Sequence, residues 1–293
     1  MSERLSLRQG YFADPKAFQA LADLLHDVFG IDITLQNRLG GPDPSSMPFG
    51  YFDEAGRCIA NFSAFSMPLV IEGRVVKTAG FQSGAVRPGY RGRGLYRDLM
   101  HRAFAWADAE GFEVGILLTD KPDLYRSFGF QVVPQFHFCG NMPKTSFRKV
   151  HSRDLDLANA DDITLVSDIL ANRQPVSRMF AVQRQSEMFL LNALFDPEIR
   201  LSYLPALDAV IGWKIDGDTV QLLDIAARQI PLVADICAAL GVPLERIEVF
   251  FPTDRLGWSG DAKPYAGSCA LMVRGIDPSA VPTPAMLSPM ADF

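Results

Sequence analysis

Residues 82–96 read QSGAVRPGYRGRGLY, and the order of elements that they predict decides the fold. Residues 82–86 suit a strand, and residues 87–89 (RPG) end it. Residues 91–96 (RGRGLY) then turn into a helix, because apolar residues recur at helical spacing from there to residue 110. The unpaired N–H groups at the start of this helix point toward one place, with the positive end of the helix dipole behind them. Such a turn predicts a phosphate-binding site.

Two kinds of residue in the turn favour an anion. Gly92 and Gly94 let the backbone approach a ligand closely, because a Cβ would obstruct it. Arg91 and Arg93 add positive charge for a diphosphate. Turns rich in Arg and Gly also occur in ordinary surface loops, so the prediction depends on the elements around the turn.

These elements predict an α/β unit in the first half of the chain. Its strands are rich in β-branched and aromatic residues and are separated by short turns, which favours antiparallel pairing. The apolar run at residues 114–118 suits a strand buried on both faces. The expected helices are 15–29, 94–110 and about 122–128, and the expected strands are 50–52, 58–65, 69–71, 75–86, 114–118 and 130–138.

The second half repeats this order faintly, as strand, hairpin, strand, helix and strand. Residues 226–229 (AARQ) stand where the Gly-rich turn stood, so this copy lacks the anion-binding chemistry. A polar, mixed segment at residues 141–162 separates the halves and suits a linker. The expected helices are 163–172, 183–194 and 230–240, and the expected strands are 201–204, 209–215, 220–225, 247–251 and 270–273.

The strand, turn and helix resemble the GNAT N-acetyltransferase superfamily, whose acyl-CoA turn reads (Gln/Arg)-x-x-Gly-x-(Gly/Ala) directly after a strand. Arg91 and Gly94 match their positions, whereas Tyr96 stands where a small residue is usual and could crowd the pyrophosphate. A bulky residue there, together with the second half, looks like the enhanced-intracellular-survival (Eis) type. That type usually ends in a further sterol-carrier-like domain, for which 293 residues are too few.

The resemblance implies a GNAT fold, an α/β fold with a central, mostly antiparallel mixed sheet flanked by helices and a second, degenerate GNAT-like domain. The chain would then divide into a GNAT acyl-CoA-binding catalytic domain (1–140), a linker (141–162), a degenerate GNAT-like domain (163–277) and an irregular tail (278–293).

The resemblance also implies an acid. Tyr125 lies before Gly129-Phe130, where GNAT enzymes commonly carry a tyrosine that protonates the departing CoA thiolate. A phenol with a pKa of about 10 suits this transfer, although a packing role for Tyr125 is the alternative. Acetyl-CoA would be the co-substrate, with the strand edge at Val86 holding its pantetheine arm. The residues expected to bind it are Val86, Arg91, Gly92, Arg93, Gly94, Leu95 and Tyr96.

The sequence offers no clear general base to deprotonate the amine. Gln82 and Ser83 have no useful basicity, and Asp120 suits a solvated loop or a helix cap better. In the Eis type a C-terminal carboxylate can reach the active site, and Phe293 ends this sequence. If the Pro-rich tail folds back, Phe293 is a catalytic candidate, and a disordered end is the alternative.

Composition excludes several classes of protein. With 48% apolar and 21% charged residues the chain should fold, and a net charge of −6 without a Lys/Arg run indicates neither nucleic acid nor anionic lipid as a partner. It fits a cationic substrate. The N-terminus has no apolar core of signal-peptide length and no stretch is long enough for a membrane span, so we expect a cytoplasmic protein.

Cysteines and histidines are dispersed along the chain. We expect four reduced cysteines in the core and no metal site, because no CxxC pair or histidine lies at metal-ligand spacing. These residues are Cys58, Cys139, Cys237, Cys269, His26, His101, His137 and His151.

We therefore predict an N-acetyltransferase that moves an acetyl group from acetyl-CoA to a primary amine by direct transfer in a ternary complex. A non-catalytic acyl-CoA-binding or regulatory module is the alternative. The acceptor is a small-molecule or peptide amine, and a polyamine, an aminoglycoside-like sugar, a peptide N-terminus and a lysine are all compatible. The sequence leaves the acyl chain length and the oligomeric state open.

Overall fold

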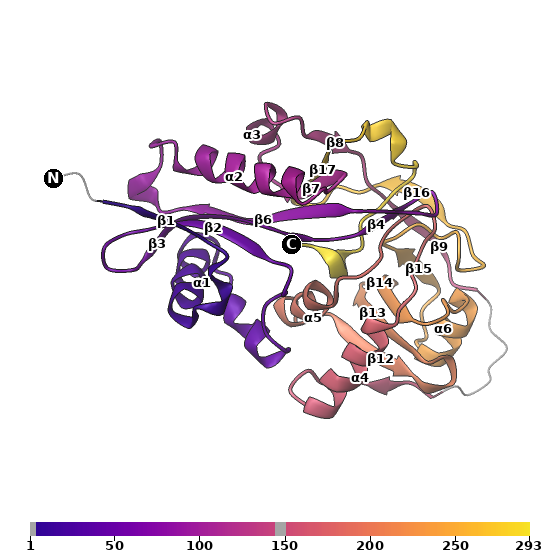
Figure 1. Cartoon of the computed structure of the whole chain (residues 1–293). Helices are drawn as coiled ribbons and strands as arrows, with labels where there is room; N and C mark the ends of the chain where they lie inside the picture. Colours follow the sequence, from indigo (N-terminus) through magenta and orange to yellow (C-terminus); the bar gives the residue numbers. More distant parts are fainter. Residues whose placement is uncertain (1–3, 144–150) are drawn as a thin grey trace.

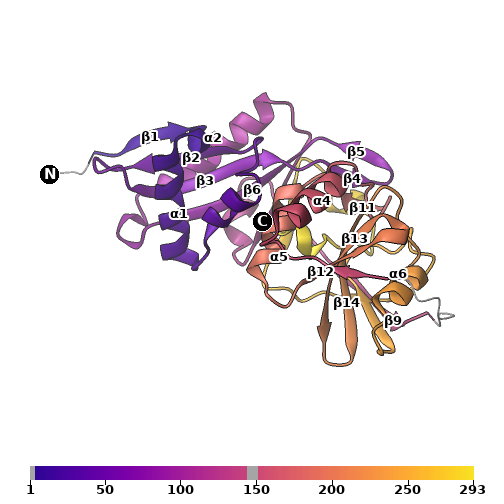
Figure 2. The ribbon, with the colours of Figure 1, turned by 90° about the horizontal axis from the view of Figure 1, so that it is seen from below.

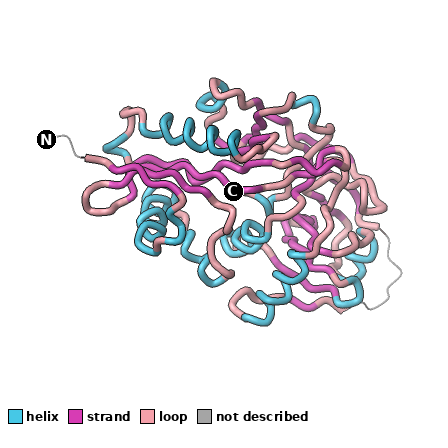
Figure 3. The backbone as a smooth tube through the Cα atoms, viewed as in Figure 1, coloured by secondary structure: helices cyan, strands magenta, loops and turns pink. Residues whose placement is uncertain are grey.

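The structure is a computed structural model that describes residues 4–143 and 151–293. These residues form two sheets of seven strands and one sheet of three, with helices on the faces of the larger sheets (Figures 1 and 3). Each larger sheet has one parallel pair of strands among antiparallel pairs. The predicted fold class, α/β with mixed sheets flanked by helices, is confirmed. Within the described ranges, none of the helices is long and apolar enough to span a membrane.

The first sheet lies between two helices. Strand β3 is buried along almost its whole length, because α1 covers one face of the sheet and α2 covers the other (Figure 1). Apolar residues at helical spacing give each helix one buried face. In the order of the sheet the strands are β1 (Ser6–Gln9), β2 (Met47–Phe52), β3 (Cys58–Ser66), β6 (Thr78–Val86), β7 (Val114–Thr119), β17 (Ala270–Arg274) and β8 (Gln131–Val133), and the helices are α1 (Pro15–Phe29) and α2 (Leu95–Ala109).

The second sheet also carries helices on both faces. Helix α6 packs against one face, and α4 and α5 pack against the other. The strands β13 and β14 form the hairpin that the Asp-Gly-Asp turn predicts. In the order of the sheet the strands are β10 (Arg153–Asp154), β12 (Arg200–Leu204), β13 (Ala209–Asp216), β14 (Thr219–Ala227), β15 (Arg246–Val249), β9 (Phe136–Asn141) and β16 (Asp261–Pro264), and the helices are α4 (Ala160–Ala171), α5 (Ser186–Phe195) and α6 (Val233–Leu240).

The two halves exchange a strand. The expected single strand at 130–138 is wrong: Pro134 interrupts it, because proline has no N–H to donate, and β9 beyond it joins the second sheet. In return β17, expected in the second half, pairs with β7 and β8 in the first sheet. Strand β10 and the first residues of α4 also fall within the expected linker, of which residues 144–150 lie outside the described residues. The division at residues 140 and 163 therefore stays a prediction, and sheet membership crosses it.

A small three-stranded sheet joins the halves at another place. The hairpin of β4 (Leu69–Ile71) and β5 (Arg74–Val76) turns at Glu72 and Gly73, which both have positive φ, as a tight hairpin turn requires. Strand β11 (Phe180–Val182) of the second half pairs with β4.

The tail lies between the two halves (Figure 2). Residues 278–293 contain two 3-10 helices, Pro278–Ala280 and Pro289–Ala291, and all of them are described. Its apolar side chains are shared between the two hydrophobic clusters. Val281, Ala285, Leu287 and Ala291 pack with the first sheet, whereas Met286 and Met290 pack with α4, α5 and the second sheet. The alternative of a disordered end is therefore wrong for this tail.

Candidate active site

The turn after β6 has the backbone that its sequence predicts. Gly94 is the residue before α2 and has a φ of 78°, and Gly92 has a φ of 74°. A Cβ at either glycine would meet no atom of the described residues within 4 Å, so the positive φ is what requires glycine here. Because Gly94 has no side chain to cap the helix, the N–H groups of the first turn of α2 are available to a ligand.

Both arginines of the turn bind nearby carbonyl groups. Nε of Arg91 donates to the carbonyl oxygen of Val86 at 3.2 Å, and Nη2 of Arg93 donates to that of Gly89 at 3.2 Å. The guanidinium group of Arg93 also lies over the ring of Tyr90, 4.7 Å from its centre. These contacts leave both cations exposed beside the turn, where they can contact an anion.

The strands beside the turn separate. Strand β6 pairs with β7 only from Thr78 to Gly80, although β6 continues to Val86. Before it ends, β6 bulges at Ser83, which has a φ of 58°, a strained value for a residue with a side chain. The side-chain amide of Asn61 stabilises this bulge by donating to the Ser83 carbonyl oxygen at 2.9 Å, and the hydroxyl of Tyr11 donates to Asn61 at 2.5 Å. The sequence carries no turn signal at Ser83, so the bulge was not predicted.

A cavity of about 960 Å³ occupies this opening. The turn, α1, α5 and the tail each line a part of it. Both halves of the chain therefore contribute to one site. The cavity brings together every residue that the sequence singles out for binding or catalysis, namely Val86, Arg91, Gly92, Arg93, Gly94, Leu95, Tyr96, Tyr125 and Phe293.

Tyr125 lies in this cavity on the short helix α3 (Asp123–Arg126) and is only 7% exposed. Its hydroxyl oxygen lies 2.6 Å from that of Tyr96. Burial raises the pKa of Tyr125, and the negative charge of Asp120 adds to this, whereas hydrogen bonds with Tyr96 and Thr119 lower it in part. Burial and Tyr125 raise the pKa of Tyr96 well above its usual value. Either hydroxyl can donate in this contact, and when Tyr96 donates, the Tyr125 proton is free for another acceptor.

Tyr96 does not crowd the turn. Its ring packs edge-on against Phe62 in the core, with ring centres 5.6 Å apart, and it lies over Gly84 of β6. A Cβ at residue 84 would collide with the Tyr96 hydroxyl, so glycine is required there for lack of space. The expectation that Tyr96 obstructs the pyrophosphate is therefore wrong, because the ring turns inward and supports Tyr125.

The last residues of the tail, Asp292 and Phe293, also line the cavity. The Phe293 ring packs edge-on against Phe65 with centres 5.1 Å apart, and the side-chain amide of Asn192 donates to the Asp292 carbonyl oxygen at 2.8 Å. The Asp292 side chain is accessible to solvent in the cavity. Burial of its carboxyl group among the surrounding protein atoms raises its pKa to about 7. Asp292 was not singled out from the sequence, because only the folded tail places it in the cavity.

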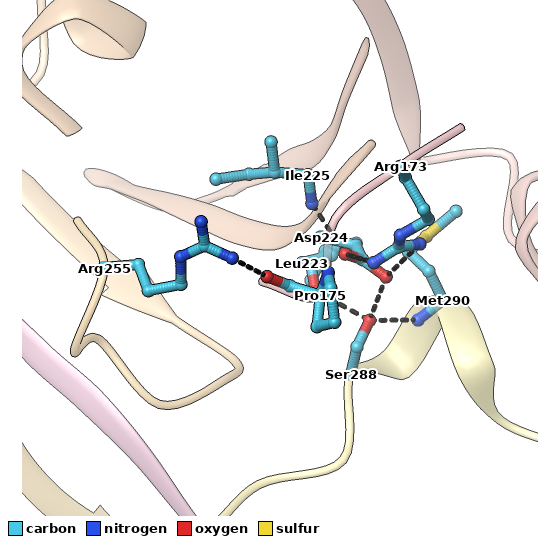
Figure 4. Close-up of polar contacts among 8 residues, drawn as sticks. All are labelled: Arg173, Pro175, Leu223, Asp224, Ile225, Arg255, Ser288 and Met290. Carbon is cyan, nitrogen blue, oxygen red and sulfur yellow. Dashed lines mark hydrogen bonds and ion pairs between the residues drawn. The ribbon is translucent and has the colours of Figure 1, made fainter. Parts of the chain in front are cut away.

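A buried ion pair holds the tail in place (Figure 4). Nη2 of Arg173 donates to Asp224 at 2.7 Å, and these side chains are 5% and 3% exposed. The Ser288 hydroxyl donates to the same carboxylate at 2.9 Å or to the Leu223 carbonyl oxygen at 3.0 Å, and it accepts from the N–H of Met290 at 3.1 Å. The tail is thereby attached to β14 four residues before Asp292.

The structure also places three other residues that the sequence analysis names, Asp120, His101 and Cys269. Asp120 lines the cavity, is exposed and lies 3.5 Å from Lys121, but it does not cap α3, which begins after Pro122. His101 is exposed on α2 and contacts Phe128. Cys269 is exposed and lines the cavity, so its predicted place in the core is wrong, whereas the other three cysteines are buried.

Comparison with known proteins identifies the family. The family model described as an acetyltransferase (GNAT) domain matches residues 13–133, which include the turn and Tyr125. Residues 13–133 are a GNAT domain. An uncharacterized N-acetyltransferase from Streptomyces griseus is 34% identical to this GNAT protein over 95 residues, which are 32% of this chain and 22% of that protein. The chain thus matches less than a quarter of that relative's length.

Solved structures resemble both halves of the chain. A conserved protein from Enterococcus faecalis, described as a probable N-acyltransferase, has a TM-score of 0.62 at 14% identity, over 92% of this chain and 72% of that one. Eis1 from Mycobacterium abscessus has a TM-score of 0.60 at 17% identity, over 92% of this chain and 73% of that one. At such identities the likeness establishes the fold. The predicted GNAT domain is matched at residues 13–133, and the fold of both halves is shared with these structures.

Proposed function

We propose that this GNAT protein transfers an acetyl group from acetyl-CoA to a primary amine by direct transfer in a ternary complex. The observation that carries the proposal is that one cavity connects the phosphate-binding turn, the separated strands and Tyr125. The diphosphate of CoA would bind the N–H groups at the start of α2, with Arg91 and Arg93 beside it. The pantetheine arm would then lie along β6 near Val86 and extend toward Tyr125.

The reaction needs one acid and one base. The amine nitrogen attacks the thioester carbon, and the carbon–sulfur bond breaks as the amide forms. Tyr125 gives its proton to the departing sulfur. The hydrogen bond between Tyr125 and Tyr96 orients the Tyr125 hydroxyl group for this step. The proton of the amine goes to the carboxylate of Asp292, which lines the same cavity beside Phe293.

The acceptor is a small-molecule or peptide amine that enters as a cation. The carboxylate of Asp292 lines the cavity with Phe293, and a negative charge there attracts an ammonium group. The same carboxylate can first attract the ammonium group and then accept its proton.

The activity is tested by release of free thiol from acetyl-CoA with a panel of amines, including a polyamine, an aminoglycoside, a lysine and a peptide N-terminus. We expect release with at least one of them. The Gly94→Val variant should raise KM for acetyl-CoA by about tenfold or more, because a β-branched residue at a positive φ costs roughly 1–3 kcal/mol.

Gly217→Val is the matched control for this experiment. Gly217 also has a positive φ and free space for a Cβ, but it lies in the β13–β14 turn away from the cavity. Equal KM values for the two variants would remove the turn from CoA binding. Tight binding of acetyl-CoA without thiol release from any amine would favour the alternative, a non-catalytic acyl-CoA-binding module.

The role of Asp292 is tested by Asp292→Asn. We expect kcat to fall by about 10²-fold or more, the usual contribution of a general base, and KM for the amine to rise. Because Asp292 ionises at a pH of about 7, KM of the unmodified protein should fall as pH rises through 7, and Asp292→Asn should lose this dependence.

The stability of these proteins provides an independent check. The raised pKa of Asp292 means that the folded state holds this proton more tightly than the unfolded state. Its contribution to stability is complete below a pH of about 4 and is lost as pH rises through about 7. Asp292→Asn should therefore gain thermal stability relative to the unmodified protein between pH 5 and pH 8. Unchanged turnover of the folded Asp292→Asn variant would remove Asp292 from the mechanism.

A further inference from the structure

A second cluster of reactive side chains, none of which lines the cavity, lies where β9 pairs with β15. Ligand atoms of His137, Cys139 and Glu248 all lie within 4.8 Å of one another. These residues show no metal-ligand spacing along the sequence, because Glu248 comes more than 100 residues after the other two. Strand pairing brings them together.

Strand geometry explains why the three side chains meet. Side chains alternate between the faces of a sheet, so His137 and Cys139 share one face of β9, whereas Phe138 between them packs in the core of the other face. Glu248 stands directly opposite Cys139 in the antiparallel register. Its neighbours Ile247 and Val249 also belong to the opposite core, which fixes the Glu248 side chain on the face of His137 and Cys139.

We propose that His137, Cys139 and Glu248 bind one divalent transition-metal ion of the Zn²⁺ type, with water as the fourth ligand. Imidazole nitrogen, thiolate sulfur and carboxylate oxygen are the ligands that Zn²⁺ takes in proteins. In a tetrahedral site neighbouring ligand atoms lie roughly 3.5 Å apart. Sγ of Cys139 and Oε1 of Glu248 are already 3.6 Å apart, so only small side-chain rotations are needed to bring the third ligand in.

The polar groups of the cluster are incompletely paired without a metal. Nδ1 of His137 is buried and has no hydrogen-bond partner among the described residues. Phe250 stacks on the same ring, with centres 5.5 Å apart, and Tyr265 meets it edge-on at 6.1 Å. A buried ring nitrogen without a hydrogen-bond partner costs free energy, and a metal ion bound by this imidazole would offset that cost.

The contacts of Glu248 hold one carboxylate oxygen toward the cluster. Nε2 of Gln221 donates to Oε2 of Glu248 at 3.2 Å, and Oε1 faces Sγ of Cys139. Burial and Glu248 raise the pKa of the Cys139 thiol, while Lys263 and Arg246 lower it in part. When the metal binds, the thiol releases its proton to solvent, and the thiolate and carboxylate together carry two negative charges against the two positive charges of the ion. Asp261 lies opposite Cys139 on β16 and adds negative charge nearby.

The bound ion would connect β9, the strand that leaves the first half, to β15 of the second half. The test uses Co²⁺ as a spectroscopic substitute for Zn²⁺ with the full chain. We expect one Co²⁺ per chain, with a thiolate-to-cobalt charge-transfer band that Zn²⁺ displaces. Cys139→Ser should lose the band, and Gln221→Ala should weaken metal binding by about 10–100-fold through loss of the contact that orients Glu248.

Cys269→Ser is the matched control. Cys269 is the exposed cysteine of the described residues and lines the cavity of the candidate active site, not the metal cluster. It should keep the band. Circular dichroism confirms that each variant is folded, and Zn²⁺ should raise the thermal unfolding temperature of the unmodified protein but not that of His137→Ala. A titration in which the unmodified protein shows no thiolate band, or in which folded Cys139→Ser retains it, overturns the proposal. None of these measurements depends on acetyl transfer.

Discussion

Replacing Tyr125 by phenylalanine is expected to lower kcat by about 10²-fold or more while KM for acetyl-CoA changes little, because a general acid contributes about 10²–10⁴-fold. The variant removes one oxygen atom and keeps the ring that packs against Phe62 and Phe130. Phenylalanine therefore preserves the packing that the alternative role of Tyr125 would require. Steady-state kinetics with saturating amine measure the effect, and thermal unfolding tests whether the core is intact.

Tyr51→Phe is the matched control for this variant. The Tyr51 hydroxyl also hydrogen-bonds next to α2, donating to Asp98 at 2.8 Å, but Tyr51 does not line the cavity. Its loss should leave kcat unchanged. Equal turnover of Tyr125→Phe and the unmodified protein would remove Tyr125 from the mechanism and leave it as a packing residue.

The second large effect is expected at the ion pair that holds the tail. Asp224→Ala leaves the 5% exposed guanidinium of Arg173 without its carboxylate and should destabilise the fold by about 3–5 kcal/mol. It also removes one of the two acceptors of the Ser288 hydroxyl, so the attachment of the tail to β14 is reduced to the Leu223 carbonyl oxygen (Figure 4). Denaturant unfolding measures the loss of stability, and kcat measures the effect on the placement of Asp292 and Phe293.

Asp108→Ala provides the comparison for stability. Asp108 pairs with Arg274 at 2.9 Å, but these side chains are 59% and 28% exposed, so the change should cost less than about 1 kcal/mol. The double variant Arg173→Met with Asp224→Leu separates stability from positioning. It should regain much of the lost stability, since apolar residues of similar size can replace a buried pair, but not the lost turnover. Recovery of full turnover would show that the Ser288 contact does not position the tail.

Sequence reasoning was most reliable for elements determined by neighbouring residues. The helix spacing at 15–29 and the Gly-rich turn predicted α1 and the start of α2, and the Glu-Gly turn predicted the β4–β5 hairpin. Gly92 and Gly94 were correctly placed because a positive φ is a local property of the backbone.

The bulge at Ser83 and the strand exchange could not be predicted in this way. The bulge depends on hydrogen bonds from Asn61, which lies on the neighbouring strand, and on Tyr11, which supports Asn61. The exchange of β9 and β17 depends on which apolar faces each strand can bury, and the two sheets offer similar partners to any short apolar strand. Neither kind of contact leaves a pattern in adjacent residues.

By itself the sequence determined the Gly-rich turn and the helix behind it, because dihedral preferences and apolar periodicity act over a few residues. Tyr125 was singled out through the family resemblance. Only the tertiary structure decided that Tyr96 turns inward to Tyr125, that the tail carries Asp292 and Phe293 into the same cavity, and that His137, Cys139 and Glu248 meet on one face of the second sheet. These arrangements depend on burying apolar surface between segments that are distant in sequence. That free energy belongs to the assembled core and not to any one segment.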